Sequence, residues 1–142
     1  MAEGPLEIGR KYVFRKTVSE SDVYLFAGIT GDLSPNHVDE EAMRATRYGG
    51  RIAHGALIVG YMSTCSSMAV ERARDGELGT PVSVGYDRIR FTAPVLIGDT
   101  IEVAYAIVAW DPERRRSRSE VTVTNQKGTT VAVAEHVMVW VD

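Results

Sequence analysis

Residues 55–70, GALIVGYMSTCSSMAV, contain no charged side chain and place apolar side chains on nearly every helical face. We expect this stretch to form the middle of one long helix, from about Ala53 to Arg74, that is buried on most sides. It is shorter than the roughly 20 apolar residues that a bilayer requires, so we predict no membrane span.

Alternating strand patterns follow this helix. Apolar residues recur at every second position in four sets: Val82, Val84 and Tyr86; Ile101, Val103, Tyr105 and Ile107; Val121 and Val123; and Val131 to Val141 apart from Glu135. The alternation changes phase at Ile89 and Phe91, which predicts a β-bulge near Asp87-Arg88. Turn residues separate the strands at Leu96–Asp99, Asp111–Glu113 and Asn125–Gly128.

Shorter elements precede the long helix. We expect a short edge strand from Lys11 to Val18, a helix that starts after the capping candidates Ser19 to Asp22, and a second short helix from about Asp39 to Thr46. Gly31 can end the first helix, and Pro35 lacks the N–H that continues one. The segment Asp32–His37 is therefore predicted to be a loop.

This order of elements predicts the fold class. One apolar helix followed by consecutive antiparallel strands favours an α+β domain in which the sheet wraps around the helix, the architecture of the hot-dog fold. The outer face and edge strand of such a sheet need covering, so we expect a homodimer. The length of 142 residues, with 44% hydrophobic and 25% charged, is typical of one domain that spans residues 1–142.

The net charge and the cysteine content indicate which binding partners and which cellular compartment to expect. The formal net charge of −3 gives no general attraction to nucleic acid, so we predict no nucleic-acid partner. An anionic substrate would need a local basic rim, which the overall charge does not reveal. The single cysteine, Cys65, cannot form an internal disulfide, and no secretory signal opens the sequence, so we expect a cytoplasmic location.

Asp32 and His37 lie five residues apart on the predicted loop and are candidates for acid and base catalysis. A carboxylate and an imidazole can both exchange protons near neutral pH if burial shifts their pKa values. Spacing alone is weak evidence, because such residues are most often ordinary turn and capping residues.

Gly55 at the start of the apolar helix adds a possible electrophilic element. Free backbone N–H groups and the helix dipole at this point favour negative charge, which predicts an oxyanion hole. Close packing of the helix on the sheet would also explain a glycine. His54, directly before it, is either a second imidazole of the site or a structural residue that orients the loop.

Several stretches together resemble the MaoC-like dehydratases, a family that includes the R-specific enoyl-CoA hydratases. The resemblance lies in the stretches Phe26–Asp39, Ile52–Gly55, Arg90–Val95 and Gly98–Thr100. It implies that Asp32 and His37 are the catalytic pair. It also implies that the Gly55 N–H binds the thioester carbonyl and that Ser63 lines the pocket. The family commonly has Asn where this chain has Ser34, which affects only the loop's supporting hydrogen bonds.

The resemblance implies reversible addition of water to a trans-2-enoyl thioester, giving an (R)-3-hydroxyacyl thioester. The acyl group would be carried by coenzyme A or by acyl carrier protein. No metal or redox cofactor is expected, because the sequence has neither clustered Cys/His spacing nor a G-x-G-x-x-G motif, and coenzyme A would be part of the substrate.

Two other functions are compatible with a hot-dog domain. An acyl-thioesterase of this fold commonly uses a carboxylate on the central helix, but residues 55–70 contain none, and the first is Glu71. A non-catalytic subunit that binds acyl thioesters would lack part of the Asp32, His37 and Gly55 set, which this chain retains. The run Glu113–Arg116 would contact coenzyme phosphates or would simply be solvated.

Overall fold

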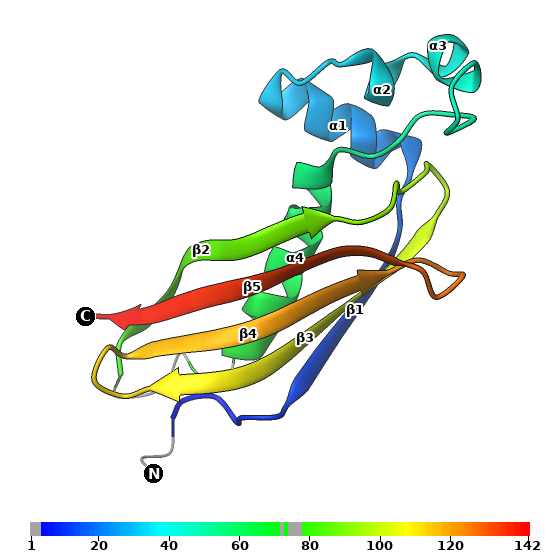
Figure 1. The fold of residues 1–142 in the computed structure, drawn as a ribbon. Coiled ribbons are helices and arrows are strands. Elements are labelled where there is room, and N and C mark those ends of the chain that lie inside the picture. Colours follow the sequence, from blue (N-terminus) through cyan, green and yellow to red (C-terminus); the bar gives the residue numbers. More distant parts are fainter. Residues whose placement is uncertain (1–3, 72, 74–77) are drawn as a thin grey trace.

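The computed structural model describes residues 4–71, 73 and 78–142 and has the predicted α+β arrangement (Figure 1). Along these residues the elements are, in order, β1 (Lys11–Thr17), α1 (Glu20–Thr30), α2 (Pro35–Val38), α3 (Glu40–Arg44), α4 (Gly55–Val70), β2 (Thr80–Phe91), β3 (Thr100–Asp111), β4 (Arg116–Thr124) and β5 (Thr130–Val141).

The strands form one antiparallel sheet with the order β1-β3-β4-β5-β2. The first and last strands in this order, β1 and β2, are its edges within the described residues. The predicted edge strand Lys11–Val18 is therefore confirmed, except that β1 ends one residue earlier, at Thr17.

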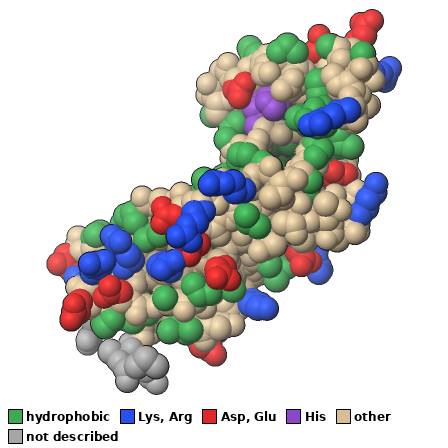
Figure 2. Space-filling model, in the orientation of Figure 1, with side chains coloured by type: hydrophobic (Ala, Val, Ile, Leu, Met, Phe, Trp, Pro, Cys, Tyr) green, Lys and Arg blue, Asp and Glu red, His purple; other side chains and the backbone are tan. Residues whose placement is uncertain are grey.

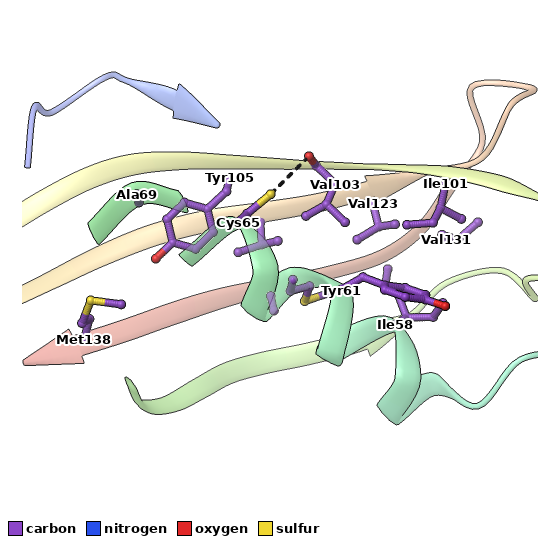
Figure 3. Packing of buried hydrophobic residues seen from close by; sticks show 14 of the residues in the cluster. Ile58, Tyr61, Cys65, Ala69, Ile101, Val103, Tyr105, Val123, Val131 and Met138 are labelled. Carbon is purple, nitrogen blue, oxygen red and sulfur yellow. Dashed lines mark hydrogen bonds between the residues drawn. The ribbon is translucent and has the colours of Figure 1, made fainter. Parts of the chain in front are cut away.

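Helix α4 packs along one face of the sheet, and its buried side chains meet those of the strands (Figure 3). On the helix side, Ile58 and Cys65 are almost completely buried; on the sheet side, Ile101, Val103 and Val123 are equally buried. Burying one large apolar side chain stabilises a fold by about 1.5–3 kcal/mol. These buried contacts stabilise the position of α4 against the sheet.

The long helix differs from its prediction in extent and in burial. It begins at Gly55 rather than Ala53 and ends at Val70. The expected end at Arg74 lies outside the described residues. The expectation of burial on most sides is wrong for the single chain, because one helix face exposes the small residues Ala56, Gly60, Ser63 and Ser67.

The predicted irregularity of β2 and the predicted turns are present. The register between β2 and β5 shifts between Asp87 and Arg90, and Arg88 has a φ of 52°. The turns before β3 and β5 place Gly98 and Gly128 at φ values of 96° and 77°, which glycine adopts without steric cost. No helix among the described residues is long and apolar enough to cross a membrane.

Helices α1, α2 and α3 lie together beyond the end of the sheet, next to the first turn of α4 (Figure 1). Helix α1 starts as predicted, with a capping box between Ser19 and Asp22. The predicted loop over Asp32–His37 is wrong in its second half, where α2 begins at Pro35. A proline fits there because the first helical residue needs no N–H bond and proline's φ already suits a helix.

Candidate active site

The helical segment that carries Asp32 and His37 is held largely by polar contacts. Arg51, whose side chain is only 11% exposed, forms ion pairs with Glu20 on α1 at 2.7 Å and with Glu40 on α3 at 2.6 Å. It also donates to the Tyr24 hydroxyl. One guanidinium therefore connects α1, α3 and the chain that leads into α4.

The end of α1 places Asp32. Gly31 ends the helix in the left-handed conformation, and its N–H donates to the carbonyl of Ala27. Asp32 follows directly, its N–H donates to the Thr30 hydroxyl, and its carboxylate accepts weakly from the Ser34 N–H at 3.4 Å. The carboxylate belongs to an exposed residue, so in the single chain Asp32 is open to solvent.

His37 on α2 has its tautomer fixed by the chain before α4. Its Nδ1 lies 2.7 Å from the carbonyl oxygen of Ile52. Since a carbonyl only accepts, Nδ1 carries the proton and the neutral ring keeps a lone pair on Nε2. The Ile52 N–H donates in turn to the carbonyl of Asn36, which completes a local clamp around the ring. The arrangement leaves Nε2 available as a base.

His54 is buried behind His37. It is 2% exposed, and its ring stacks on that of His37, with centroids 3.6 Å apart, while Phe26 covers it at 4.7 Å. Its Nε2 donates to the backbone carbonyl of Asp32 at 3.0 Å, and its buried Nδ1 has no partner among the described residues. His54 therefore contacts both members of the predicted pair.

Asp32, His37 and His54 come together as a cluster whose ligating atoms lie within 4.8 Å of one another. The set resembles metal ligands in composition, but its geometry does not fit a metal ion. A bound ion lies close to the plane of each imidazole, and these two planes are stacked at only 25° to one another. One of the two rings would have to rotate before a nitrogen lone pair of each ring could point at the same ion.

Gly55 begins α4 and lies directly against Phe91 of β2. A Cβ on this residue would lie 2.5 Å from Cε2 of the phenyl ring, so a side chain would force the ring to move. The packing explanation for this glycine is therefore confirmed. Its N–H, at the N-terminal end of a 16-residue helix, has no helical partner and lies where the dipole is positive.

A cavity of about 350 Å³ lies beside this helix end. Its wall is formed by His37, Arg47, Tyr48, Ile52, Ala53, Gly55, Ile58, Phe91, Thr92, Ala93, Pro94, Val95 and Val131. Two of the expected site residues, His37 and Gly55, thus share one cavity. Asp32, Ser63 and His54 are not part of the described wall.

Sequence reasoning missed Arg47, Tyr48 and Phe91 as cavity residues. Arg47 and Tyr48 lie between the two motif stretches, in the turn between α3 and Ile52, so only the folded chain shows that they face the same space as His37. Ser63 is exposed on α4 two turns beyond Gly55. Figure 2 shows histidine atoms at the molecular surface, with a basic side chain nearby.

His136, predicted only as a strand residue, lies in the core at 0% exposure. Its Nδ1 is 2.6 Å from the Tyr105 hydroxyl and its Nε2 is 2.7 Å from the Ser83 hydroxyl. Burial lowers the pKa of His136 to about 4 and raises the pKa of Tyr105. The ring is therefore neutral at physiological pH and holds β2, β3 and β5 together.

The arginine run lies away from this cavity. Arg114 pairs with Asp111 at 3.9 Å and Arg115 with Asp142 at 3.0 Å. Together with Arg88 and Arg118, residues Arg114 and Arg116 line a separate hollow of about 730 Å³. Neither Glu113 nor these arginines belong to the wall that His37 and Gly55 share.

Comparisons with known proteins agree on one family. The model of the family described as the MaoC like domain matches residues 4–132. A 3-hydroxybutyryl-CoA dehydratase of Methylorubrum extorquens is 41% identical over 80% of the present chain and 68% of its own length. An (R)-specific enoyl-CoA hydratase of Rhodospirillum rubrum is 38% identical over 75% and 69%. The solved (R)-hydratase from A. caviae, involved in PHA biosynthesis, has the same fold, with a TM-score of 0.84, 22% identity and coverage of 96% and 98%.

Proposed function

This chain belongs to the MaoC-like dehydratase family, and on that premise we propose that it adds water reversibly to a trans-2-enoyl thioester, giving an (R)-3-hydroxyacyl thioester. The observation that carries the proposal is that His37, whose Nδ1 is bound to the Ile52 carbonyl, and Gly55 in the first turn of α4 line one cavity. The reactions in the two relatives' names support it.

His37 would act as the base. Its Nε2 takes a proton from water while the water oxygen forms the bond to Cβ of the enoyl group, and the π electrons move toward the thioester carbonyl. The imidazolium then returns that proton to Cα as the enolate collapses. One water is consumed, both additions occur on one face, and His37 ends as it began.

Asp32 would hold the water. Its carboxylate lies within 4.8 Å of a ring nitrogen of His37, close enough for one water molecule to contact both groups. By accepting the second O–H of the water, Asp32 directs an oxygen lone pair toward Cβ. In the dehydration direction the same contact receives the departing hydroxyl as water.

Gly55 would stabilise the enolate. Its backbone N–H can donate to the thioester oxygen, where negative charge develops, and the helix dipole favours that charge. Losing one such donor in a well-studied hydrolase costs about 10²–10³ in rate, so this contribution is comparable with that of the base.

His54 would act as a positioning residue rather than by touching the substrate, because it is buried behind His37. Its Nε2–H bond to the Asp32 carbonyl ties the loop to the ring that stacks on His37. Replacement by Gln keeps an N–H donor near the place of Nε2, whereas replacement by Phe keeps the stacking ring but removes the donor. We expect kcat to fall more in the Phe variant, at similar KM; equal loss in both would contradict the role of the donor.

A homodimer would complete this site. Asp32 is exposed in the single chain, and the nearby side chains of Leu25, Ile29 and Leu33 are 64%, 82% and 64% exposed. Edge strand β2 and the exposed small-residue face of α4, which includes Ser63, offer further surface for a second copy. Sedimentation should give twice the chain mass.

Three further expectations stay predictions. Ser63 would line the acyl pocket, the reaction would need no metal or redox cofactor, and the location would be cytoplasmic.

The test follows enoyl-thioester absorbance and free thiol together, with purified protein and acyl chains of several lengths. A hydratase removes the absorbance without releasing thiol. Thiol release without hydration would favour the thioesterase alternative, although α4 as described carries no Asp or Glu. A folded protein inert on every chain would favour a non-catalytic binding subunit.

A further inference from the structure

The wall of the candidate active-site cavity carries an unbalanced positive charge. Within the described residues, this wall includes Arg47 but no Asp or Glu, although the chain as a whole has a net charge of −3. Arg47 is exposed, so an anion could reach it without either charge being fully desolvated. An acidic protein needs such a local positive charge to attract an anionic thioester.

Arg47 also differs from the neighbouring arginines in its partners. Arg44 and Arg51 both pair with Glu40, at 3.6 Å and 2.6 Å. No carboxylate of the described residues lies within 4.0 Å of the Arg47 guanidinium, which instead donates to the Tyr48 hydroxyl at 3.0 Å and lies over the Tyr48 ring at 5.1 Å. That contact uses one of five N–H donors, so several are left to bind a ligand.

The chain around Arg47 fixes its position. The Thr46 hydroxyl donates to the Met43 carbonyl and accepts from the Tyr48 N–H, and Gly49 then turns with a φ of 69°. This turn leads into Arg51 and Ile52, which hold the α1–α3 segment and His37. The backbone of Arg47 therefore belongs to the same turn that leads to Ile52, whose carbonyl binds the base.

We propose that Arg47, oriented by Tyr48, binds the phosphate that joins the pantetheine arm of the substrate to its carrier. The inference rests on the proposed function, because an acyl thioester of coenzyme A or of acyl carrier protein presents that same phosphate. Arginine suits phosphate because its planar N–H groups can bind two oxygens at once. With the acyl group at His37 and Gly55, the arm would leave the cavity past Arg47.

The experiment compares one trans-2-enoyl group on three carriers: coenzyme A, 4′-phosphopantetheine and pantetheine without phosphate. Arg47→Ala should raise KM roughly ten-fold for the first two, the factor that about 1.4 kcal/mol gives, and leave kcat unchanged. The pantetheine ester should show no change. Arg47→Lys should recover part of the loss because it keeps the charge, and Arg47→Ala should weaken the salt dependence of kcat/KM.

Two arginines serve as matched controls. Arg44→Ala removes an exposed charge from the same helical segment, and Arg114→Ala removes one from the separate hollow on the sheet; neither should change any KM. Four outcomes would overturn the assignment. In Arg47→Ala they are an equal rise in KM for the pantetheine ester, a rise for the coenzyme A ester alone, or no rise in KM for any ester. The fourth is a rise in KM in Arg114→Ala instead. Wild-type protein inert on all three esters would instead contradict the proposed function.

Discussion

The α4–sheet core and the α1–α3 segment are held by different forces. In the core, α4 and the strands bury large apolar side chains, among them Met62, Ile101 and Ile107, each at most 1% exposed. In the α1–α3 segment only Val23, Ala27 and Met43 are buried, while Arg51 and its two glutamate partners connect the helices. The core provides most of the stability, and the segment provides most of the chemistry.

The candidate site lies where these regions meet. Gly55 comes from the core, at the start of α4, whereas Asp32 and His37 come from the polar segment. His54 connects the two, because it precedes Gly55 in the chain and contacts both residues of the pair. This division implies that changes in the segment should alter activity more than stability, and that changes in the core should do the reverse.

The largest effect is expected at His37. His37→Ala removes the base and should lower kcat by about 10²–10⁴, the usual contribution of acid–base catalysis. Since the side chain is only partly buried, the free energy of unfolding should change by less than about 1 kcal/mol. Steady-state kinetics and urea unfolding measure the two effects, with Asn36→Ala as the neighbouring control. If His37→Ala lowered the free energy of unfolding as strongly as it lowered kcat, the proposed division between the catalytic segment and the stabilising core would be contradicted.

His136 should show the opposite behaviour. Its pKa is lowered to about 4 in the folded chain and is about 6.5 when unfolded, so the unfolded chain binds the extra proton between these values. The stability that this residue contributes is full above pH 6.5 and falls as pH drops to 4, by on the order of 2–3 kcal/mol.

Urea unfolding at pH 7 and pH 4.5 measures this loss, and NMR titration of the His136 ring gives its pKa directly. Other groups titrate in the same range, so the comparison is with His136→Gln, whose stability should depend less on pH in this window. A folded-state pKa near 6.5 would contradict the account.

Gly55→Ala probes the boundary between the regions. The new Cβ would displace Phe91, which is 55% exposed and can move, so the expected loss of stability is about 1 kcal/mol. Activity should fall ten- to hundred-fold because Phe91 lines the shared cavity, so a displaced ring changes the cavity's shape. The double variant Gly55→Ala with Phe91→Leu relieves the clash and should recover activity. No recovery would show that the alanine acts through the helix start itself.

The smallest effect is expected at Arg51. Arg51→Ala frees Glu20 and Glu40, which are partly exposed and tolerate solvent, so stability should change little. The chain that leads into Ile52, whose carbonyl binds His37, loses its support, and kcat/KM should fall about ten-fold. Arg44→Ala, which removes only the exposed partner of Glu40, is the matched control. Equal kinetics in both variants would mean that the ion pairs do not position the site.

The sequence predicted the core better than the site. Alternation in β2 to β5 and the uncharged stretch of α4 follow from burial, which a linear pattern records directly. The position of Pro35 was misjudged, because proline starts a helix as readily as it interrupts one. The exposed face of α4 was also missed, since a pattern without charges does not distinguish burial within one chain from burial between two.

The site required the folded chain for a different reason. Asp32, His37 and Gly55 were candidates from spacing and from the family resemblance. Their arrangement in space depends on contacts that a pattern of apolar and polar residues does not reveal. These contacts are the bond between the Ile52 carbonyl and His37, the stacking of the buried His54 ring on His37, and the packing of the Phe91 ring against Gly55. Arg47 was missed because one arginine in a turn resembles any solvated charge until its neighbours are known.

The most direct test of hydration at this site is the NMR spectrum of the product formed in deuterated water. Wild-type protein should give an (R)-3-hydroxyacyl thioester that carries one deuterium at Cα, added to the same face as the hydroxyl, and Asp32→Ala and His37→Ala should form it at least a hundred-fold more slowly. A product without the 3-hydroxyl group, addition to opposite faces, or unchanged rates in both variants would contradict the account.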